Sequence, residues 1–141
     1  VMKENIIMEI EYESDEMPNI YCAINVRFAN ENDALYAIKQ LAELSVKTTE
    51  YRKPKVIGQG YFSIACIKNK PYWYLDDALK DMFAMIDHCL PQICRIIKQN
   101  CGWSLIDIAF YHDERYPALV FEGENMRKIR MLEADISIDA Y

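Results

Sequence analysis

Histidine, the commonest acid–base catalyst, is rare in this 141-residue sequence. Only two histidines occur, His88 and His112, and neither lies in a recognisable catalytic motif. Cys89 follows His88, but neighbouring positions on a helix point in different directions, so we do not expect the thiol and the imidazole to pair. Residues 58–60 read Gly-Gln-Gly, without the third glycine and the following helix of a phosphate-binding loop. These residues therefore predict neither an enzyme nor a cofactor site.

Three aspartates are better placed to act together, because each lies on or beside a predicted strand. Asp107 interrupts the apolar strand 105–111, and Asp135 and Asp139 lie near the ends of a short strand at 136–138. If these strands pair, the three carboxylates could line one face of a sheet, as a site for a hard cation requires. The simpler interpretation, which we favour, is that they face water. The Cys and His spacings of zinc sites do not occur in the sequence, so we expect no bound metal.

The cysteines predict a reduced, cytoplasmic protein. Their number is odd, no C-x-x-C pair occurs, and the first residues lack the charged and apolar regions of a signal peptide. We expect them to be free thiols that act as small buried apolar side chains. The five are Cys22, Cys66, Cys89, Cys94 and Cys101.

The net charge points to a basic protein partner. The chain has 22 acidic and 16 basic side chains, a formal charge of -6, which disfavours nucleic acid and anionic membranes as partners. No apolar run approaches the roughly 20 residues of a membrane helix. The acidic excess lies at the two ends of the chain, while residues 51–100 are basic. Two acidic sets are our candidate partner-binding residues, with plain solvated surface as the alternative; they are Glu9, Glu11, Glu13, Asp15 and Glu16 near the N-terminus, and Asp113 and Glu114 in a turn.

Aromatic residues gather in the basic middle of the sequence. Aromatic side chains beside Lys and Arg can stack on bases, and they are also enriched at protein interfaces. Because the net charge is negative, we favour contact with a protein over contact with nucleic acid. The interpretation that we favour most is a partly buried aromatic layer beside the sheet. The residues concerned are Tyr51, Tyr61, Tyr72, Trp73 and Tyr74.

Hydrophobic periodicity predicts strands that alternate with helices. Period-two patterns predict strands at 6–12, 20–28, 61–67, 105–111, 118–121 and 136–138, and a further possible strand begins at 46. Helical spacing predicts helices at 31–44, from 76 to about 101, and around 126–132. Asn30 should cap the first helix, Pro91 should kink or break the second near Cys89, and Gly102 should end it. The strands at 6–12 and 20–28 could form a hairpin, and residues 68–71 read as a turn.

These elements predict one α+β domain over residues 1–141. The sheet should be mostly antiparallel, with two main helices and one short helix packed on it. A chain of this length can bury a core without help from a disulfide or a metal.

The second half of the chain resembles a family of small bacterial proteins, the domain-of-unknown-function family numbered 4279. The likeness depends on the order of a capped helix start, a strand, a Pro-led apolar segment and a closing strand. The segments are 75–79, 105–108, 117–121 and 134–141. The usual Gly and Pro turn of that family is missing around 45–60, and the strand at 6–12 looks like an addition.

The resemblance implies no catalytic residues, and small bacterial proteins of this kind resemble immunity proteins. We therefore expect a toxin-neutralising immunity protein that binds a cognate bacterial toxin, a nuclease, and blocks it through an acidic surface. One alternative is a small enzyme or ligand-binding domain using Asp107, His112 and the aromatic residues. Another is a homo-oligomeric structural protein that pairs through an exposed strand edge.

Overall fold

The structure is a computed structural model that describes residues 17–49, 60–111 and 116–141. Its elements follow one another as four strands, four α-helices and one short 3₁₀ turn within these residues. They are β1 (Asn19–Phe28), α2 (Glu31–Glu43), β2 (Gly60–Pro71), α3 (Leu75–Ala84), η2 (Asp87–Cys89), α4 (Leu90–Gln99), β3 (Trp103–Tyr111), α5 (Gly123–Met131) and β4 (Asp135–Ala140). The predicted strand at 6–12, and its hairpin with β1, lie outside the described residues.

The strands form one mixed sheet in the order β2-β1-β3-β4. β1 runs antiparallel to both β2 and β3, whereas β4 runs parallel to β3. The parallel pair arises because α5 carries the chain back to the starting end of β3 before β4 begins. The predicted α+β class with a mostly antiparallel sheet is confirmed.

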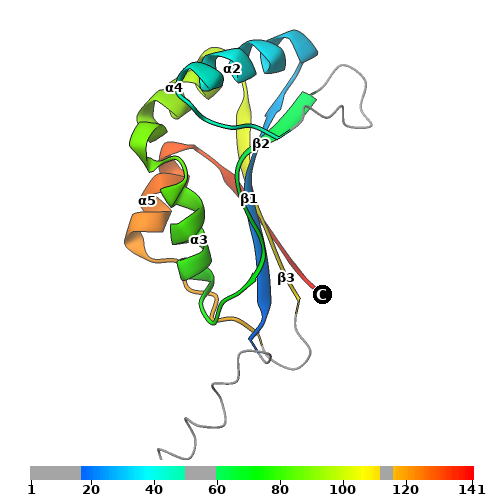
Figure 1. The fold of residues 1–141 in the computed structure, drawn as a ribbon, viewed down its shortest axis with the longest axis vertical. Helices are drawn as coiled ribbons and strands as arrows, with labels where there is room; N and C mark the ends of the chain where they lie inside the picture. Colours follow the sequence, from blue (N-terminus) through cyan, green and yellow to red (C-terminus); the bar gives the residue numbers. More distant parts are fainter. Residues whose placement is uncertain (1–16, 50–59, 112–115) are drawn as a thin grey trace, which may run out of the picture.

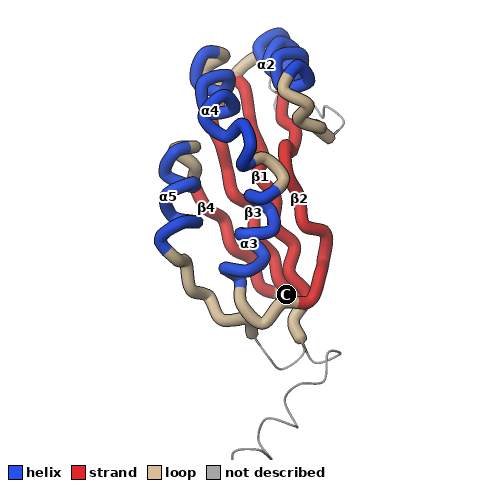
Figure 2. Tube along the Cα trace, turned by 60° about the vertical axis from the view of Figure 1, so that its left-hand side comes forward, coloured by secondary structure: helices blue, strands red, loops and turns tan. Residues whose placement is uncertain are grey.

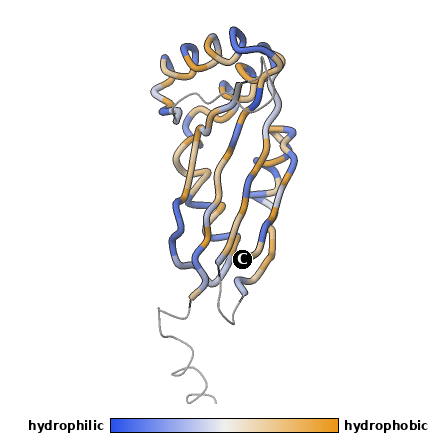
Figure 3. The backbone as a smooth tube through the Cα atoms, turned by 90° about the vertical axis from the view of Figure 1, so that its right-hand side faces the viewer, coloured by the Kyte–Doolittle hydropathy of each residue, from blue (hydrophilic) through white to orange (hydrophobic). Residues whose placement is uncertain are grey.

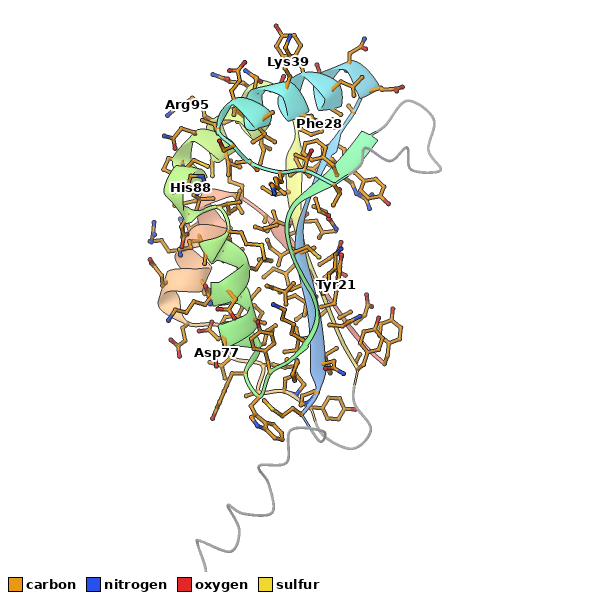
Figure 4. All side chains as sticks on the ribbon, viewed as in Figure 1. Tyr21, Phe28, Lys39, Asp77, His88 and Arg95 are labelled. Atoms are coloured by element: carbon orange, nitrogen blue, oxygen red, sulfur yellow. The ribbon has the colours of Figure 1, made fainter. Side chains whose placement is uncertain are left out.

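The helices cover one face of the sheet (Figures 1 and 2). On β3 every second residue from Ser104 to Phe110 is buried beneath them, as the period-two pattern predicts. At the upper end α2 closes the core, where the ring of Phe28 stacks on Phe62 with centroids 5.7 Å apart (Figure 4). None of the described helices has both the length and the apolar character needed to cross a bilayer.

The first predicted helix is confirmed with its cap. α2 begins after Asn30, whose side-chain oxygen accepts a hydrogen bond of 2.8 Å from the backbone N–H of Asp33. The acidic side chains of Glu31 and Asp33 lie in its first turn, where the positive end of the helix dipole favours them.

The second predicted helix is divided, as Pro91 suggested. α3 ends at Ala84, the 3₁₀ turn η2 follows, and α4 begins at Leu90 with Pro91 in its first turn, where the missing N–H costs no helical hydrogen bond. The expected role of Gly102 needs correction, because the left-handed residue after α4 is Cys101, with φ of 57°. Glycine is needed at 102 for space, since a Cβ there would lie 2.5 Å from the Phe28 ring.

Polar side chains attach α5 to the neighbouring helix. Asn125 donates 2.7 Å to the Asp76 carboxylate at the start of α3. Lys128 is buried, and its Nζ lies 2.8 Å from Asp87 and 5.7 Å from the centre of the Phe83 ring. These buried polar groups are acceptable because each has a partner.

Three local predictions are wrong. Residues 118–121 form no strand, and only an isolated bridge joins Ala118 to Tyr74. Residues 46–49 are not a strand either, although Thr49 exchanges hydrogen bonds with Ser63. Residues 68–71 are the end of β2 rather than a turn, because β1 offers a pairing partner along the whole length up to Asn19 opposite Pro71.

Candidate functional site

The face of the sheet opposite the helices is the candidate site, because no described helix or strand packs on it (Figure 1). Its residues alternate with the core residues along each strand, so that Asn25 and Arg27 lie on this face between buried neighbours. On β3 the open-face positions run from Trp103 through Leu105 and Asp107 to Tyr111. Figure 3 views the sheet from this side and shows polar and apolar residues mixed along the strands. We call it the open face.

A row of hydrogen-bonded polar side chains crosses the middle of the open face. The amide nitrogen of Asn25 donates to a carboxylate oxygen of Asp107, and the hydroxyl of Ser63 donates to the amide oxygen of Asn25. Ser63 is itself fixed at the outer edge, where its N–H donates 2.9 Å to the hydroxyl of Thr49. The row therefore connects β3, β1 and β2 with the segment that follows α2.

This row gives Asp107 a structural partner. The sequence suggested that Asp107 faces water, but the side chain is half-buried and bound by Asn25. The hydrogen bond from the Asn25 amide holds the Asp107 carboxylate in one orientation. Asn25 and Ser63 are functional-site candidates that the sequence alone did not predict. Their polar side chains at open-face positions of apolar strands were the available signal.

Tyr21 and Cys66 lie next to this row. Tyr21 points away from the helices (Figure 4), and burial, followed by the neighbouring Cys66 thiol and the Asp107 carboxylate, raises its pKa to about 12. Burial also raises the pKa of Cys66, against the smaller lowering effects of Tyr21 and Lys68. A thiol with a raised pKa is protonated at neutral pH and is a poor nucleophile.

Aromatic and cationic side chains frame the two ends of the open face. At the upper end the guanidinium of Arg27 lies 5.5 Å from the centre of the Tyr61 ring, and its Nε is buried without a hydrogen-bond partner. Trp103 occupies the next strand beside Arg27. At the lower end Tyr111 and Tyr141 stack with centroids 5.1 Å apart. Tyrosine, tryptophan and arginine are the residues enriched at the centres of protein interfaces.

The three aspartates of the sequence analysis share the open face. Asp135 pairs with Leu105 and Asp139 with Ala109, so both carboxylates lie on the same side of the sheet as Asp107. They do not form a metal site, because in the described parts of the chain no three His, Cys, Asp or Glu side chains are grouped to hold an ion.

The aromatic residues of the basic middle segment do not form one cluster. Tyr61 is the second residue of β2, whereas Tyr72, Trp73 and Tyr74 follow its end. A strand of 12 residues spans about 36 Å. Tyr72 donates 2.8 Å to Asp81 of α3 instead. Tyr51 lies outside the described residues.

The acidic candidates also fall outside the part of the chain that the structure describes. This applies to both sets, Glu9, Glu11, Glu13, Asp15 and Glu16 in the first and Asp113 and Glu114 in the second, and to His112. Their role as partner-binding residues stays a prediction.

His88 and Cys89 are closer than the sequence analysis predicted. The Cys89 Sγ lies 3.4 Å from the His88 Nε2. The expectation that they point apart assumed an α-helix, whereas both residues lie in the 3₁₀ turn η2. Burial raises the pKa of the Cys89 thiol, so the contact does not produce an activated thiolate.

A groove of about 520 Å³ runs beside the outer edge of β2. Residues 45–49 form one wall, and Cys66, Lys68 and Met85 contribute to the other. Its size is within the range of small-molecule sites, and Lys47 and Lys68 give it two cationic groups.

Comparisons with family profiles, curated proteins and solved structures found no match to this chain. The resemblance to domain-of-unknown-function family 4279 therefore stays a prediction from the residues.

Proposed function

We propose that this chain is a toxin-neutralising immunity protein, which binds a cognate bacterial toxin of the nuclease type and blocks it. The observation that carries the proposal is the open face. Helices bury the other face of the same sheet, while this face presents aromatic side chains together with fixed polar groups. Trp103 and Tyr111 are exposed by 42% and 44%.

The arrangement favours binding over catalysis. The polar side chains in the middle of the open face bond to one another, so they are held in place before a partner arrives. Burial raises the pKa of the Cys66 thiol on this face, which is the wrong direction for a nucleophile at neutral pH.

The charge of the chain supports a basic partner. Asp135 and Asp139 are exposed on β4 at one side of the open face, and the acidic sets outside the described residues would add to them. A nuclease presents basic groups to phosphates, and complementary charge speeds its encounter with an acidic protein.

The test is binding to the protein encoded next to this chain, with that protein's nuclease activity measured in parallel. We expect a complex that suppresses the activity and an association rate that falls as salt rises. Trp103→Ala and Tyr111→Ala should each weaken binding about tenfold, the loss typical of aromatic side chains that anchor an interface. Tyr36→Ala, an exposed tyrosine on α2, is the matched control and should leave binding unchanged.

Charge reversal of the two acidic sets, Glu9, Glu11 and Glu13 in one variant and Asp113 and Glu114 in the other, should slow association in at least one case. No complex with the neighbouring protein, or a complex that leaves its activity intact, would sink the proposal.

The groove beside β2 favours a second candidate, a domain that binds a small anionic ligand. The ligand-binding alternative from the sequence used the aromatic residues of the basic middle segment. Those residues lie at two ends of β2, so the groove is now the better basis for it. Titration with small carboxylates and phosphates, followed by NMR, should shift amide signals at 45–49 and 63–68. Unchanged signals at these residues would exclude the groove as an anion site.

A further inference from the structure

The outer edge of β4 is the least protected backbone edge in the described structure. β4 lies beside β3 at one side of the sheet, and no described strand pairs with its other side (Figure 2). Its pairing with β3 is regular over six residues, without a register shift. A regular strand edge is a template for a further strand.

One hydrogen bond fixes which backbone groups point outward. The N–H of Tyr141 donates 2.9 Å to the carbonyl of Phe110 in β3. Successive residues of a strand direct their N–H and C=O groups to opposite edges. Asp139 and Ser137 therefore face β3 as Tyr141 does, and Ile136 and Ile138 direct their N–H and C=O groups to the outer edge.

The side chains along this edge have two characters. Ile136 and Ile138 lie on the helix side of the sheet, yet they are exposed by 39% and 42%. Asp135 and Asp139 project to the open face, and both are exposed. A strand that pairs here would meet apolar side chains on one side of the sheet and negative charge on the other.

The opposite edge of the sheet is protected in ways that β4 lacks. β2 has two register shifts against β1, carries Lys68 and Lys70, and ends at Pro71. Lysine, proline and irregular pairing are the usual means of preventing edge-to-edge association. β4 has neither lysine nor proline between Asp135 and Ala140.

We propose that the outer edge of β4 binds an extended strand of a partner protein in which basic and apolar residues alternate. The partner backbone pairs with the N–H and C=O groups of Ile136 and Ile138. Its apolar side chains pack on these isoleucines, and its basic side chains meet Asp135 and Asp139 across the strands. The inference rests on the proposed function only for the identity of that partner.

Charge disfavours the two other occupants that the chain itself offers. A second copy that pairs antiparallel about Ser137 would place Asp135 opposite Asp139 of its neighbour, and like charges across a strand pair are destabilising. The predicted strand at 6–12 carries Glu9 and Glu11, which would add negative charge to the same edge.

The experiment uses the full chain and two synthetic ten-residue peptides. One alternates lysine with valine, and the other alternates glutamate with valine. We expect NMR shifts along β4, together with at least a tenfold slower hydrogen exchange for the amides of Ile136 and Ile138. The glutamate–valine peptide should bind at least tenfold more weakly. Asp135→Lys combined with Asp139→Lys should reverse this preference between the two peptides.

The variant Ile138→Pro tests the outer backbone edge of β4 without disturbing the sheet. The N–H of Ile138 points outward, so this substitution removes no hydrogen bond to β3 and should leave the protein folded. It should weaken lysine–valine binding at least tenfold, whereas Ile138→Thr, which keeps the N–H, is the matched control and should weaken it less. Preserved shifts elsewhere in the spectrum confirm folding of each variant.

Other results would overturn the inference. They are slow exchange of the Ile136 and Ile138 amides in the free protein, self-association through β4, equal binding of both peptides, or shifts confined to other strands. If the neighbouring toxin binds Ile138→Pro as well as the unchanged protein, this inference fails while the proposed function stands. If the peptides bind as expected but the neighbouring protein does not, the proposed function fails alone.

Discussion

The two faces of the central sheet are made by the same strands and differ in almost every other respect. On the covered face, residues such as Ile24 and Ile106 are fully buried and lie in one apolar core with the helices. On the open face, their chain neighbours Asn25 and Leu105 are half-buried. The covered face stabilises the fold by removing apolar surface from water. The open face contributes to stability through hydrogen bonds between a few polar groups.

The difference shows what the polar row contributes. β2 shifts register against β1 between Ile24 and Asn25, and Ser63 pairs with Asn25 on the far side of that shift. A slip by one residue would move the apolar side chains to the wrong face. The bond between Ser63 and Asn25 therefore specifies the register where the backbone pairing is irregular.

The largest expected effect compares apolar truncation on the two faces. Ile106→Ala should lower the free energy of unfolding by about 2–5 kcal/mol, because it leaves a cavity in the core. Leu105→Ala, the adjacent residue on the open face, should cost about 1 kcal/mol. Urea unfolding followed by circular dichroism measures both. Equal losses would mean that the open face is as deeply buried as the core.

The second effect concerns the end of the core that α2 covers, where Phe28 stacks on Phe62. Gly102→Ala should destabilise by about 1–3 kcal/mol, because the added methyl group forces the Phe28 ring out of its stack on Phe62. Gly123→Ala is the matched control, since a Cβ there has no neighbour within 4 Å. Thermal unfolding should show a lower Tm for the first variant and an unchanged or higher Tm for the second. Similar Tm values would contradict the packing argument.

The third effect tests the polar row. Asn25→Ala should cost about 1–3 kcal/mol, because Asp107 and Ser63 both lose a partner. A double-mutant cycle with Asp107→Ala should give a coupling energy of about 0.5–3 kcal/mol, as for residues in direct contact. Additive losses would show that the two side chains do not interact in solution.

The smallest effect uses alkaline pH to compare neighbours on opposite faces. Burial, followed by Cys66 and Asp81, raises the pKa of the Cys22 thiol from 9.0 to about 12. The unfolded thiol loses its proton near pH 9, so stability from the folded, protonated thiol declines as pH rises from about 9 toward 12. We expect a loss of about 1 kcal/mol by pH 10.

The pKa of Tyr21 is raised from 10.0 to about 12, so this residue should add to the loss of stability only above pH 10. Urea unfolding between pH 8 and 11 measures both groups. Cys22→Ala should make the decline between pH 9 and 10 shallower, the remainder coming from other thiols with a raised pKa, such as Cys66 and Cys89, whereas Tyr21→Phe should leave it unchanged in this interval.

Local pattern determined much of the fold. Alternation marked β1 and β3 and assigned their residues to two faces, because the side-chain period of a strand is fixed by its pleat. Asn30 and Pro91 marked helix boundaries, because their effects on the backbone act within one turn. Net charge and composition pointed to a basic partner without locating its contact surface.

Tertiary structure alone decided the rest. The sequence pattern does not indicate which strands become neighbours. It therefore could not predict that β4 runs parallel to β3, or that Asn25 bonds to Asp107, 82 positions away. Residues 68–71 have the composition of a turn, yet pairing with β1 holds them in β2. Gly102 is required because Phe28, far away in the chain, occupies the space of its missing side chain. Each of these outcomes depends on contacts between distant segments, which form only when the whole core assembles.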